Sequence, residues 1–306
     1  MALTINTNIS SLVAQKNLTN ATTSLNKAIE RMSTGYKINH AGDNAAGYSI
    51  ARNWETQLSS LDVAADNAAT GADMMSTLED NYSLISTHLQ RVRDLTEQAA
   101  NGTYGSSSLK PIRSEIKARL DEIDRIAANC EFNGRKMMLG SGSADPAAIT
   151  SSIKLQVGLY SDVNSQVTLD SSLFNSAKVD GLFTSAICGT TYASADAVAT
   201  ACTGYNETGV AVSGANPSQR LQEIDKVINE ISKRTTTLGA AQNRIDSAIE
   251  SIAVQSENIT SSLSTLRDAD ISKESSNYIK AQILQQASAT LLSTANQSPS
   301  IALNLI

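Results

Sequence analysis

Apolar residues recur with alternating steps of three and four positions through the last third of the chain. The seam runs from Leu221 to Leu266, and only Thr235, Gln242 and Ser256 interrupt its apolar residues. Such an alternation averages 3.5 residues and forms a narrow apolar stripe on one face of a helix, as in coiled coils. At about 1.5 Å per residue, this helix would be roughly 70 Å long. We therefore expect a rod rather than a segment that wraps around a small globule.

The first half of the chain carries the same alternation and supplies partners for this rod. The longer seam comprises Met75, Leu78, Tyr82, Ile85, Leu89, Val92, Thr96 and Ala99, and the shorter one comprises Ile112, Ile116, Leu120, Ile123 and Ile126. The link at 101–106 is rich in turn-forming residues, and Pro111 suits the first turn of the next helix. The pattern predicts helix, turn and helix, packed as an antiparallel bundle beside the C-terminal helix.

Two shorter amphipathic stretches lie near the ends of the chain. The first comprises Leu18, Ala21, Leu25, Ala28, Ile29 and Met32, and Gly35 after it is typical of helix C-termini. The second comprises Ile279, Ile283, Leu284, Ala287, Leu291 and Leu292, and ends near Pro299. Isolated helices of this length bury too little surface to offset nucleation. We expect them to become ordered only against each other or against neighbouring molecules.

The middle of the chain differs in kind. Apolar and polar residues alternate from Ile153 to Leu159, and Val167 and Leu169 follow a turn, which predicts a β-hairpin near 153–169. Residues 179–216 are rich in Ala, Ser, Thr and Gly, so we expect a small insert or long loop on the surface. The predicted fold class is mainly α: an elongated antiparallel α-helical bundle or coiled coil formed by the N- and C-terminal segments, with a small β-hairpin and a short insert.

Composition and charge argue against several classes of protein. Aromatic residues make up only 4% of the chain, which argues against a large globular core. The formal net charge is -6, whereas a general nucleic-acid binder needs a basic face. No run of about 18 apolar residues occurs, so we expect no membrane insertion. The N-terminus lacks a basic region followed by an apolar one, so we expect no cleaved signal peptide.

The sequence offers little for catalysis or metal binding. It has two histidines and no metal-binding motif, so we expect no catalytic residue, no cofactor and no metal. His40 lies near Asp43 in a loop, which we interpret as a surface pair, and Trp54 is expected to pack at a helix interface. Cys188 and Cys202 could form a disulfide, but with three cysteines in all we favour free thiols.

Short motifs follow one another in a fixed order near both ends of the chain. They are MSTGYKIN at 32–39, DNAAG at 43–47, LQRVRDL at 89–95, EIDR at 122–125, EFNG at 131–134, DAD at 268–270 and KAQILQQA at 280–287. Together they resemble the motifs of the bacterial flagellins, over roughly 1–170 and 218–306. The resemblance implies a structural protein rather than an enzyme, one that polymerises into the flagellar filament used for swimming motility.

The resemblance also implies partners and a location. Members of the family are exported by the flagellar type III secretion machinery with an export chaperone, without a cleaved signal peptide, and polymerise under a filament cap outside the cell. The partners would be further copies of the chain and the hook–filament junction proteins. The implied division is 1–44 with 272–306 as terminal helices of the inner filament core, 45–178 with 217–271 as a helical rod, and 179–216 as a variable surface insert.

The terminal helices are expected to pack in the filament core through large apolar side chains. These are Leu18, Leu25, Met32, Ile283, Leu284, Leu291 and Leu292. The C-terminal members would face helices of neighbouring subunits. The alternative is that these leucines only pack against the N-terminal stretch of the same molecule.

The LQRVRDL motif has two interpretations. Its spacing places Leu89, Val92 and Thr96 in the helix seam and gives Arg91 and Leu95 a shared outward face, where an arginine is often only a solvated charge. The resemblance implies instead recognition by the vertebrate Toll-like receptor for flagellin. The implied receptor-binding residues are Gln90, Arg91, Leu95, Ile112 and Glu115. The same face would contact the next subunit of the filament, so the receptor would need free monomer.

Three other functions remain open from the sequence. A hook–filament junction protein would share the terminal helices, although LQRVRDL and EFNG favour flagellin. An enzyme with its chemistry in the insert is a weaker alternative, because 179–216 contains no histidine and no nucleophile–base pair. A cytoplasmic coiled-coil adaptor would leave the terminal motifs unexplained.

Overall fold

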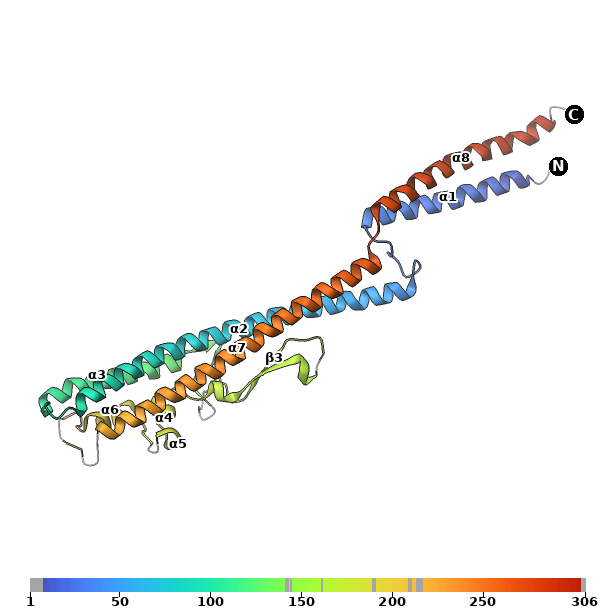
Figure 1. Ribbon diagram of the computed structural model, residues 1–306. Coiled ribbons are helices and arrows are strands. Elements are labelled where there is room, and N and C mark those ends of the chain that lie inside the picture. Colours follow the sequence, from blue (N-terminus) through green and yellow to red (C-terminus); the bar gives the residue numbers. More distant parts are fainter. Residues whose placement is uncertain are drawn as a thin grey trace. The chain divides into compact units, whose positions relative to one another are not determined.

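The structure is a computed structural model that describes residues 8–140, 143, 145–160, 162–188, 191–208, 211–212 and 217–303. Its long helices are α1 (Ile9–Thr34), α2 (Ala45–Ala100), α3 (Ser106–Asn129), α7 (Pro217–Arg267) and α8 (Ile271–Leu303) (Figure 1). The chain divides into two compact units, Met1–Ser59 with Gln255–Ile306, and Ser60–Val254. Both boundaries therefore fall inside α2 and α7, rather than at the ends of these helices.

The first unit contains α1 and α8, which lie side by side and antiparallel. Asn8 caps α1 by accepting a hydrogen bond from the backbone N–H of Ser11. The helix ends at Gly35, whose φ of 75° is left-handed, as the sequence predicted. The prediction that the second stretch ends near Pro299 is wrong, because α8 continues to Leu303.

Small residues form the contact between α1 and α8. Ala14, Ala21 and Ala28 are buried on α1 at intervals of seven positions, and Ala281 and Ser288 are buried on α8 at the same interval. Small side chains allow two helix axes to approach closely. Among the residues of α8 whose burial the structure describes, no large apolar residue is fully buried in this seam.

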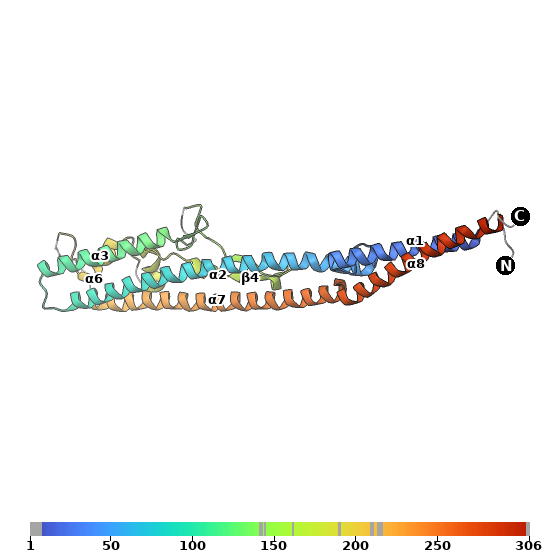
Figure 2. The same ribbon diagram turned by 90° about the horizontal axis from the view of Figure 1, so that it is seen from above.

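In the second unit, the apolar seams of α2, α3 and α7 form the core. Every seam residue expected on α2 and α3 is buried, and every one expected on α7 as far as Ile252 is buried or half-buried. Arg93 on α2 pairs with Asp225 on α7 at 2.6 Å, and Gln242 donates to Glu79 at 2.8 Å, so the two helices are antiparallel (Figure 2). The predicted antiparallel bundle is confirmed.

Two antiparallel hairpins accompany these helices. The predicted one consists of β3 (Ile153–Gln156) and β4 (Gln166–Leu169), with Ile153 opposite Leu169. A short 3₁₀ turn, η1 (Val163–Ser165), joins them. The second hairpin pairs β1 (Glu131–Phe132) with β2 (Arg135–Lys136). Both turn residues of this hairpin, Asn133 and Gly134, have positive φ, which the Asn-Gly pair of the EFNG motif supplies.

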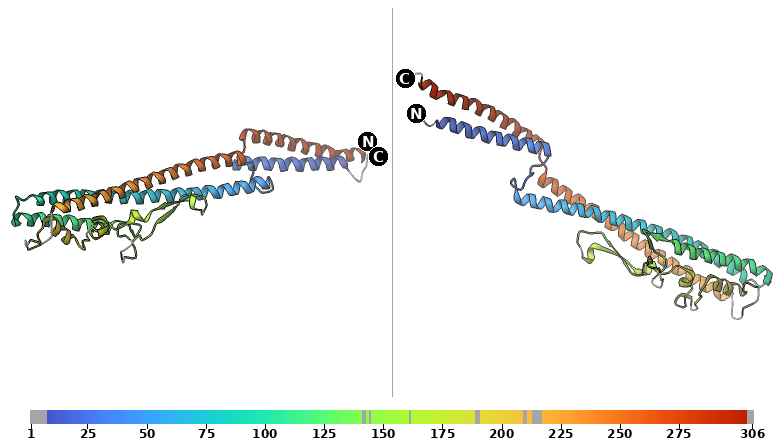
Figure 3. Two further views of the ribbon diagram at one scale, coloured as in Figure 1. Left: turned by 60° about the horizontal axis from the view of Figure 1, so that its bottom comes forward. Right: turned by 180° about the vertical axis from the view of Figure 1, so that it is seen from behind.

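The insert is a small helical unit rather than a long loop, which is the first of the two forms that its composition suggested. It contains α4 (Val179–Leu182), α5 (Ser185–Cys188) and α6 (Ala195–Thr203), and follows the 3₁₀ turn η2 (Ser171–Phe174). Figure 3 shows the hairpin and the short helices on one side of α2 and α7. Helix α6 packs on α3, and Val198 and Cys202 are almost fully buried. The sequence did not predict this packing because its hydrophobic periodicity is weak. Several buried positions are occupied by Ala and Cys rather than by large apolar residues.

Candidate interaction sites

The LQRVRDL motif lies on α2 beside α3, and one ion pair joins the two helices at its surface. The guanidinium of Arg91 reaches Glu115 with both Nε and Nη2 at 3.0 Å from Oε1. The two side chains are 49% and 38% exposed, and Gln90 beside them is exposed. The structure therefore brings together three of the five predicted receptor-binding residues at an accessible surface.

The other two predicted receptor-binding residues face inward. Leu95 is only 2% exposed and Ile112 only 8%. The expectation that Leu95 shares an outward face with Arg91 is therefore wrong. The cause is that α3 and α7 both flank α2, through Arg91 and Arg93 respectively, so its buried arc is wider than a single seam.

The terminal helix pair turns large apolar residues outward. On α8, Ile283, Leu284 and Leu291 are exposed, and Leu292 is half-buried. On α1, Leu18, Leu25 and Met32 are half-buried. Leu284 and Leu291 also line a groove that they share with Ala21 and Ala28 of α1. Packing against neighbouring subunits and its alternative, packing within one molecule, therefore both stay predictions.

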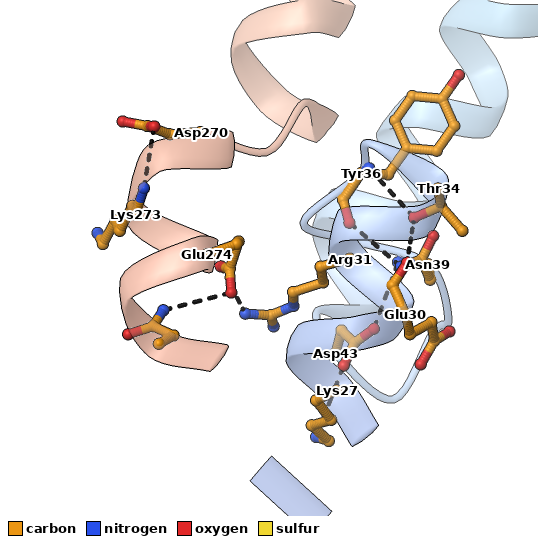
Figure 4. Close-up of polar contacts among 11 residues, drawn as sticks. Lys27, Glu30, Arg31, Thr34, Tyr36, Asn39, Asp43, Asp270, Lys273 and Glu274 are labelled. Carbon is orange, nitrogen blue, oxygen red and sulfur yellow. Dashed lines mark hydrogen bonds and ion pairs between the residues drawn. The ribbon is translucent and has the colours of Figure 1, made fainter. Parts of the chain in front are cut away.

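A polar network closes the end of this pair where α1 stops and α8 begins (Figure 4). Arg31 points from α1 to Glu274 on α8, with Nη1 and Oε1 3.3 Å apart. Asp43 accepts backbone hydrogen bonds from Asn39 and His40 and lies 3.7 Å from Lys27. Burial alone would raise the pKa of Asp43, but these hydrogen bonds and the nearby cations lower it below its usual value.

His40 lies in the same loop; its backbone N–H donates to Asp43, whereas its imidazole pairs with Glu30. Its Nε2 lies 2.7 Å from Glu30 Oε1, and the imidazole is largely exposed. Trp54 is half-buried and lines a cavity of about 620 Å³ together with Ile38 and Leu266. Nothing in either arrangement supplies a nucleophile beside a base. In the described ranges no cluster of His, Cys, Asp or Glu has the geometry to hold a metal ion.

Sequence reasoning missed two buried arginines that hold the second unit together. Arg113 on α3 pairs with Asp196 and donates to Thr200 Oγ1 at 3.3 Å, which fixes α6. Arg234 on α7 pairs with Glu230 and donates to the carbonyl of Ser176 at 3.0 Å. Both positions sit next to seam positions, which is the one signal in the sequence that could have pointed to them.

All three cysteines are free and buried. Burial raises the pKa of Cys130 and Cys188 to about 11, and that of Cys202 to about 12. A thiol is a weak nucleophile because the thiolate is the reactive form. These residues therefore act as small core side chains.

Comparison with known proteins agrees with the helices and motifs. Residues 5–143 match the bacterial flagellin N-terminal helical region, and residues 221–306 match the bacterial flagellin C-terminal helical region. The flagellin of Bacillus subtilis (strain 168) is 33% identical over 306 residues and covers 99% of each chain. Polar flagellin F of Vibrio parahaemolyticus is 31% identical over 376 residues and covers 100% of each.

A solved structure assigned to a flagellar hook-associated protein of Vibrio parahaemolyticus has a similar fold. Its TM-score is 0.58 at 17% identity, over 74% of this chain and 100% of that one. Across the ranges that the structure describes, every helix is too short or too polar to cross a membrane. Because the two flagellin regions match most of the chain, it belongs to the bacterial flagellin family and is a structural subunit of the flagellar filament rather than an enzyme.

Proposed function

We propose that this chain polymerises through its terminal helices, which form the inner core of the filament outside the cell. The carrying observation is the outward position of Ile283, Leu284 and Leu291 on α8, which are 62%, 49% and 62% exposed. On α1, Ile9, Leu12 and Val13 are also more than half exposed. Contiguous apolar surface of this kind on a soluble chain indicates an interaction site.

The small-residue seam explains why these large side chains are free to bind neighbours. Ala21 and Ala281 are buried in the contact between α1 and α8, whereas Ile283 and Leu291 each remain 62% exposed. Burying one Leu or Ile side chain stabilises an interface by about 1.5–3 kcal/mol. Several such side chains per subunit supply the driving force for a polymer whose subunits are held without covalent bonds.

The test is elongation of sheared filament seeds by purified full-length monomer, followed by sedimentation. The double variant Leu284→Ser/Leu291→Ser should fail to elongate the seeds, because it removes two exposed apolar contacts. The matched control is Gln286→Ser, an exposed polar position on the same helix. Normal elongation by the double variant would contradict the proposal.

We further propose that the free monomer is recognised by the vertebrate Toll-like receptor for flagellin at the Arg91–Glu115 pair. Gln90, Arg91 and Glu115 form the accessible part of the surface, and Leu95 and Ile112 support it from below. An arginine fork is a frequent anchor at protein interfaces because it offers several donors on an apolar stem. The pair spans α2 and α3, so the surface exists only in the folded chain.

Receptor activation by purified monomer tests this assignment. Arg91→Ala should reduce activation strongly, whereas Arg125→Ala should not. Arg125 is a matched control because it is an exposed arginine in a local ion pair with Glu122 on α3. Equal activity of the two variants would show that Arg91 is not part of the receptor surface.

The remaining partners follow from the same role. We propose that an export chaperone, the filament cap and the hook–filament junction proteins act on this chain during assembly. The competing assignment is a junction protein, which the fold shared with the hook-associated structure keeps open. A filament subunit should be the major component of sheared filaments, whereas a junction protein should be present in few copies.

A further inference from the structure

The connection between α1 and α2, residues 35–44, is tied to the connection between α7 and α8. We call residues 35–44 the strap. The backbone N–H of Lys37 donates to the carbonyl of Arg267 at 2.7 Å, and the N–H of Ala269 donates to the carbonyl of Gly35 at 2.8 Å. Tyr36 and Asp268 thus form an antiparallel bridge. Two short non-helical segments, far apart in sequence, are paired with each other.

One side chain, Arg267, joins this pairing to both long helices. It is the last residue of α7, and its guanidinium lies 4.2 Å from the centre of the Tyr36 ring on the strap. Its Nη1 pairs with Glu55 on α2, and the arginine side chain is only 13% exposed. A guanidinium suits both contacts because it stacks on an aromatic face while its edge binds a carboxylate.

The strap has further attachments beside this one. Lys37 donates from Nζ to the carbonyl of Thr265 at 2.8 Å, in the last turn of α7. Ile38 is 5% exposed and lies against the first turns of α2, where a Cβ on Gly47 would meet its Cδ1 at 2.9 Å. The strap is therefore held by an apolar contact on α2 and by polar contacts at the end of α7. The pairs of His40 with Glu30 and of Asp43 with Lys27 attach it to α1.

We propose that Arg267 is a clasp that holds the strap closed on the ends of α2 and α7. Backbone segments of this length lose considerable conformational entropy when ordered, so two backbone hydrogen bonds alone would hold them weakly. The clasp adds a cation–π contact and an ion pair. These two contacts form together only when the strap, α2 and the end of α7 are all in place. Opening it would free the strap and loosen the attachment of α1 and α8 without unfolding any helix.

Amide hydrogen exchange and tryptophan fluorescence of the full-length monomer test the clasp. The amides of Lys37 and Ala269 report on the strap pairing. Trp54 is the one tryptophan of the chain and shares a cavity with Lys37 and Ile38, so its emission reports on the same place. Arg267→Gln should speed exchange of both amides by about tenfold and shift the emission to longer wavelength.

Arg52→Gln is the matched control. Arg52 pairs with the same carboxylate, Glu55, at 3.1 Å and stacks over Tyr48, but it is 59% exposed and does not touch the strap. It should leave both readouts unchanged. Tyr36→Leu should change both readouts in the same direction but less, because it removes the stacked pair and keeps the ion pair with Glu55. The double variant should be no worse than Arg267→Gln alone, because that variant already removes both contacts.

Three results would overturn the proposal. Unprotected amides at Lys37 and Ala269 in the unmodified chain would show that no closed strap exists. Equal effects of Arg52→Gln and Arg267→Gln on exchange and fluorescence would show that any loss of positive charge near Glu55 loosens the strap, and that Arg267 has no special role. Faster exchange throughout 60–254 in Arg267→Gln would make Arg267 a general structural residue rather than a clasp. Each readout uses the monomer, so the result is independent of whether the chain polymerises as proposed.

Discussion

The side-chain amide of Asn8 donates a 2.7 Å hydrogen bond to the carbonyl of Ala295, across the interface between α1 and α8. In a regular helix that carbonyl would accept from the N–H of residue 299, but Pro299 has none. The side chain of Asn8 thus replaces the hydrogen-bond donor that Pro299 lacks in the opposite helix. Its Oδ1 caps α1 at the same time, by accepting from the N–H of Ser11.

Asn8→Asp should separate these two roles. The carboxylate keeps the cap on α1 but loses the donor and faces the carbonyl of Ala295, so amide exchange near the C-terminal end of α8 should become several-fold faster. Pro299→Ala restores an N–H for that carbonyl and should make the chain insensitive to Asn8→Asp. Equal sensitivity to Asn8→Asp with and without Pro299→Ala would show that Asn8 does not compensate for the proline.

Gly71 on α2 lies directly under the hairpin. A Cβ at this position would overlap with Leu155 Cδ1. Replacing glycine by alanine inside a helix normally stabilises by about 1 kcal/mol. Gly71→Ala should bring no such gain, but the same change in a Leu155→Ala background should recover it. Urea unfolding of the unmodified chain, the two single variants and the double variant measures the free energy of unfolding of each. A full gain from Gly71→Ala alone would contradict this prediction, because it would mean that the hairpin moves away from the new methyl group at no cost in free energy.

The three thiols should not react with a thiol reagent in the folded chain. Their raised pKa values, about 11 to 12, leave almost no thiolate at pH 8, and burial blocks access. A colorimetric disulfide reagent should therefore titrate no thiol in the folded protein and three in guanidinium. Fewer than three after unfolding without reductant would indicate the alternative disulfide between Cys188 and Cys202.

Two aspartates should shift the pH dependence of stability in opposite directions. Burial raises the pKa of Asp124 above its usual value, despite the hydrogen bond that it accepts from the N–H of Val179. The folded state therefore binds this proton more tightly than the unfolded state, and ionisation at neutral pH costs stability. Asp124→Asn should stabilise the chain at pH 7, and the advantage should shrink as the pH falls through the raised pKa.

Asp170 provides the opposite case. The backbone N–H of Ser172 donates to its carboxylate and lowers its pKa. The stability that the ionised carboxylate of Asp170 contributes is present above the ordinary pKa of an aspartate. This stability is lost as the pH falls through the lowered pKa of the folded state. Asp170→Asn should therefore destabilise the chain at pH 7 and change little at acid pH. Thermal unfolding over a pH series distinguishes the two, and the same sign for both variants would contradict the assigned causes.

The seams of α2, α3 and α7 could be read from the sequence because large apolar residues at a 3-4 spacing leave one face to bury. On α8 the same reasoning did not identify the residues that are buried against α1. There the large apolar residues Ile283 and Leu291 are exposed, whereas Ala281 and Ser288 are buried. Under the proposed assembly, the large apolar residues mark the face of α8 that would meet other subunits. The face of α8 that packs on α1 is determined by the distance between the two helix axes. Amino-acid composition does not predict that distance.

The candidate receptor surface was predictable only in part, for a related reason. The motif placed Arg91 and Glu115 on two helices, and the structure joins them. Leu95 was misplaced because a 3-4 seam assumes one neighbour, whereas α2 has helices on two sides, and both Leu95 and Thr96 are buried. Arg113 and Arg234 could not be assigned, because burial of a charge depends on partners supplied by distant segments.

The most direct test of the account is the accessibility of the outward face of α8 before and after assembly. The native thiols are buried, so Leu291→Cys adds one reactive thiol to a silent background. Thr208→Cys, at an exposed position of the insert, is the control. Both should react with a maleimide in the monomer. In sedimented filaments position 291 should be protected and position 208 should still react. Equal reaction of position 291 in monomer and filament would contradict assembly through the terminal helices.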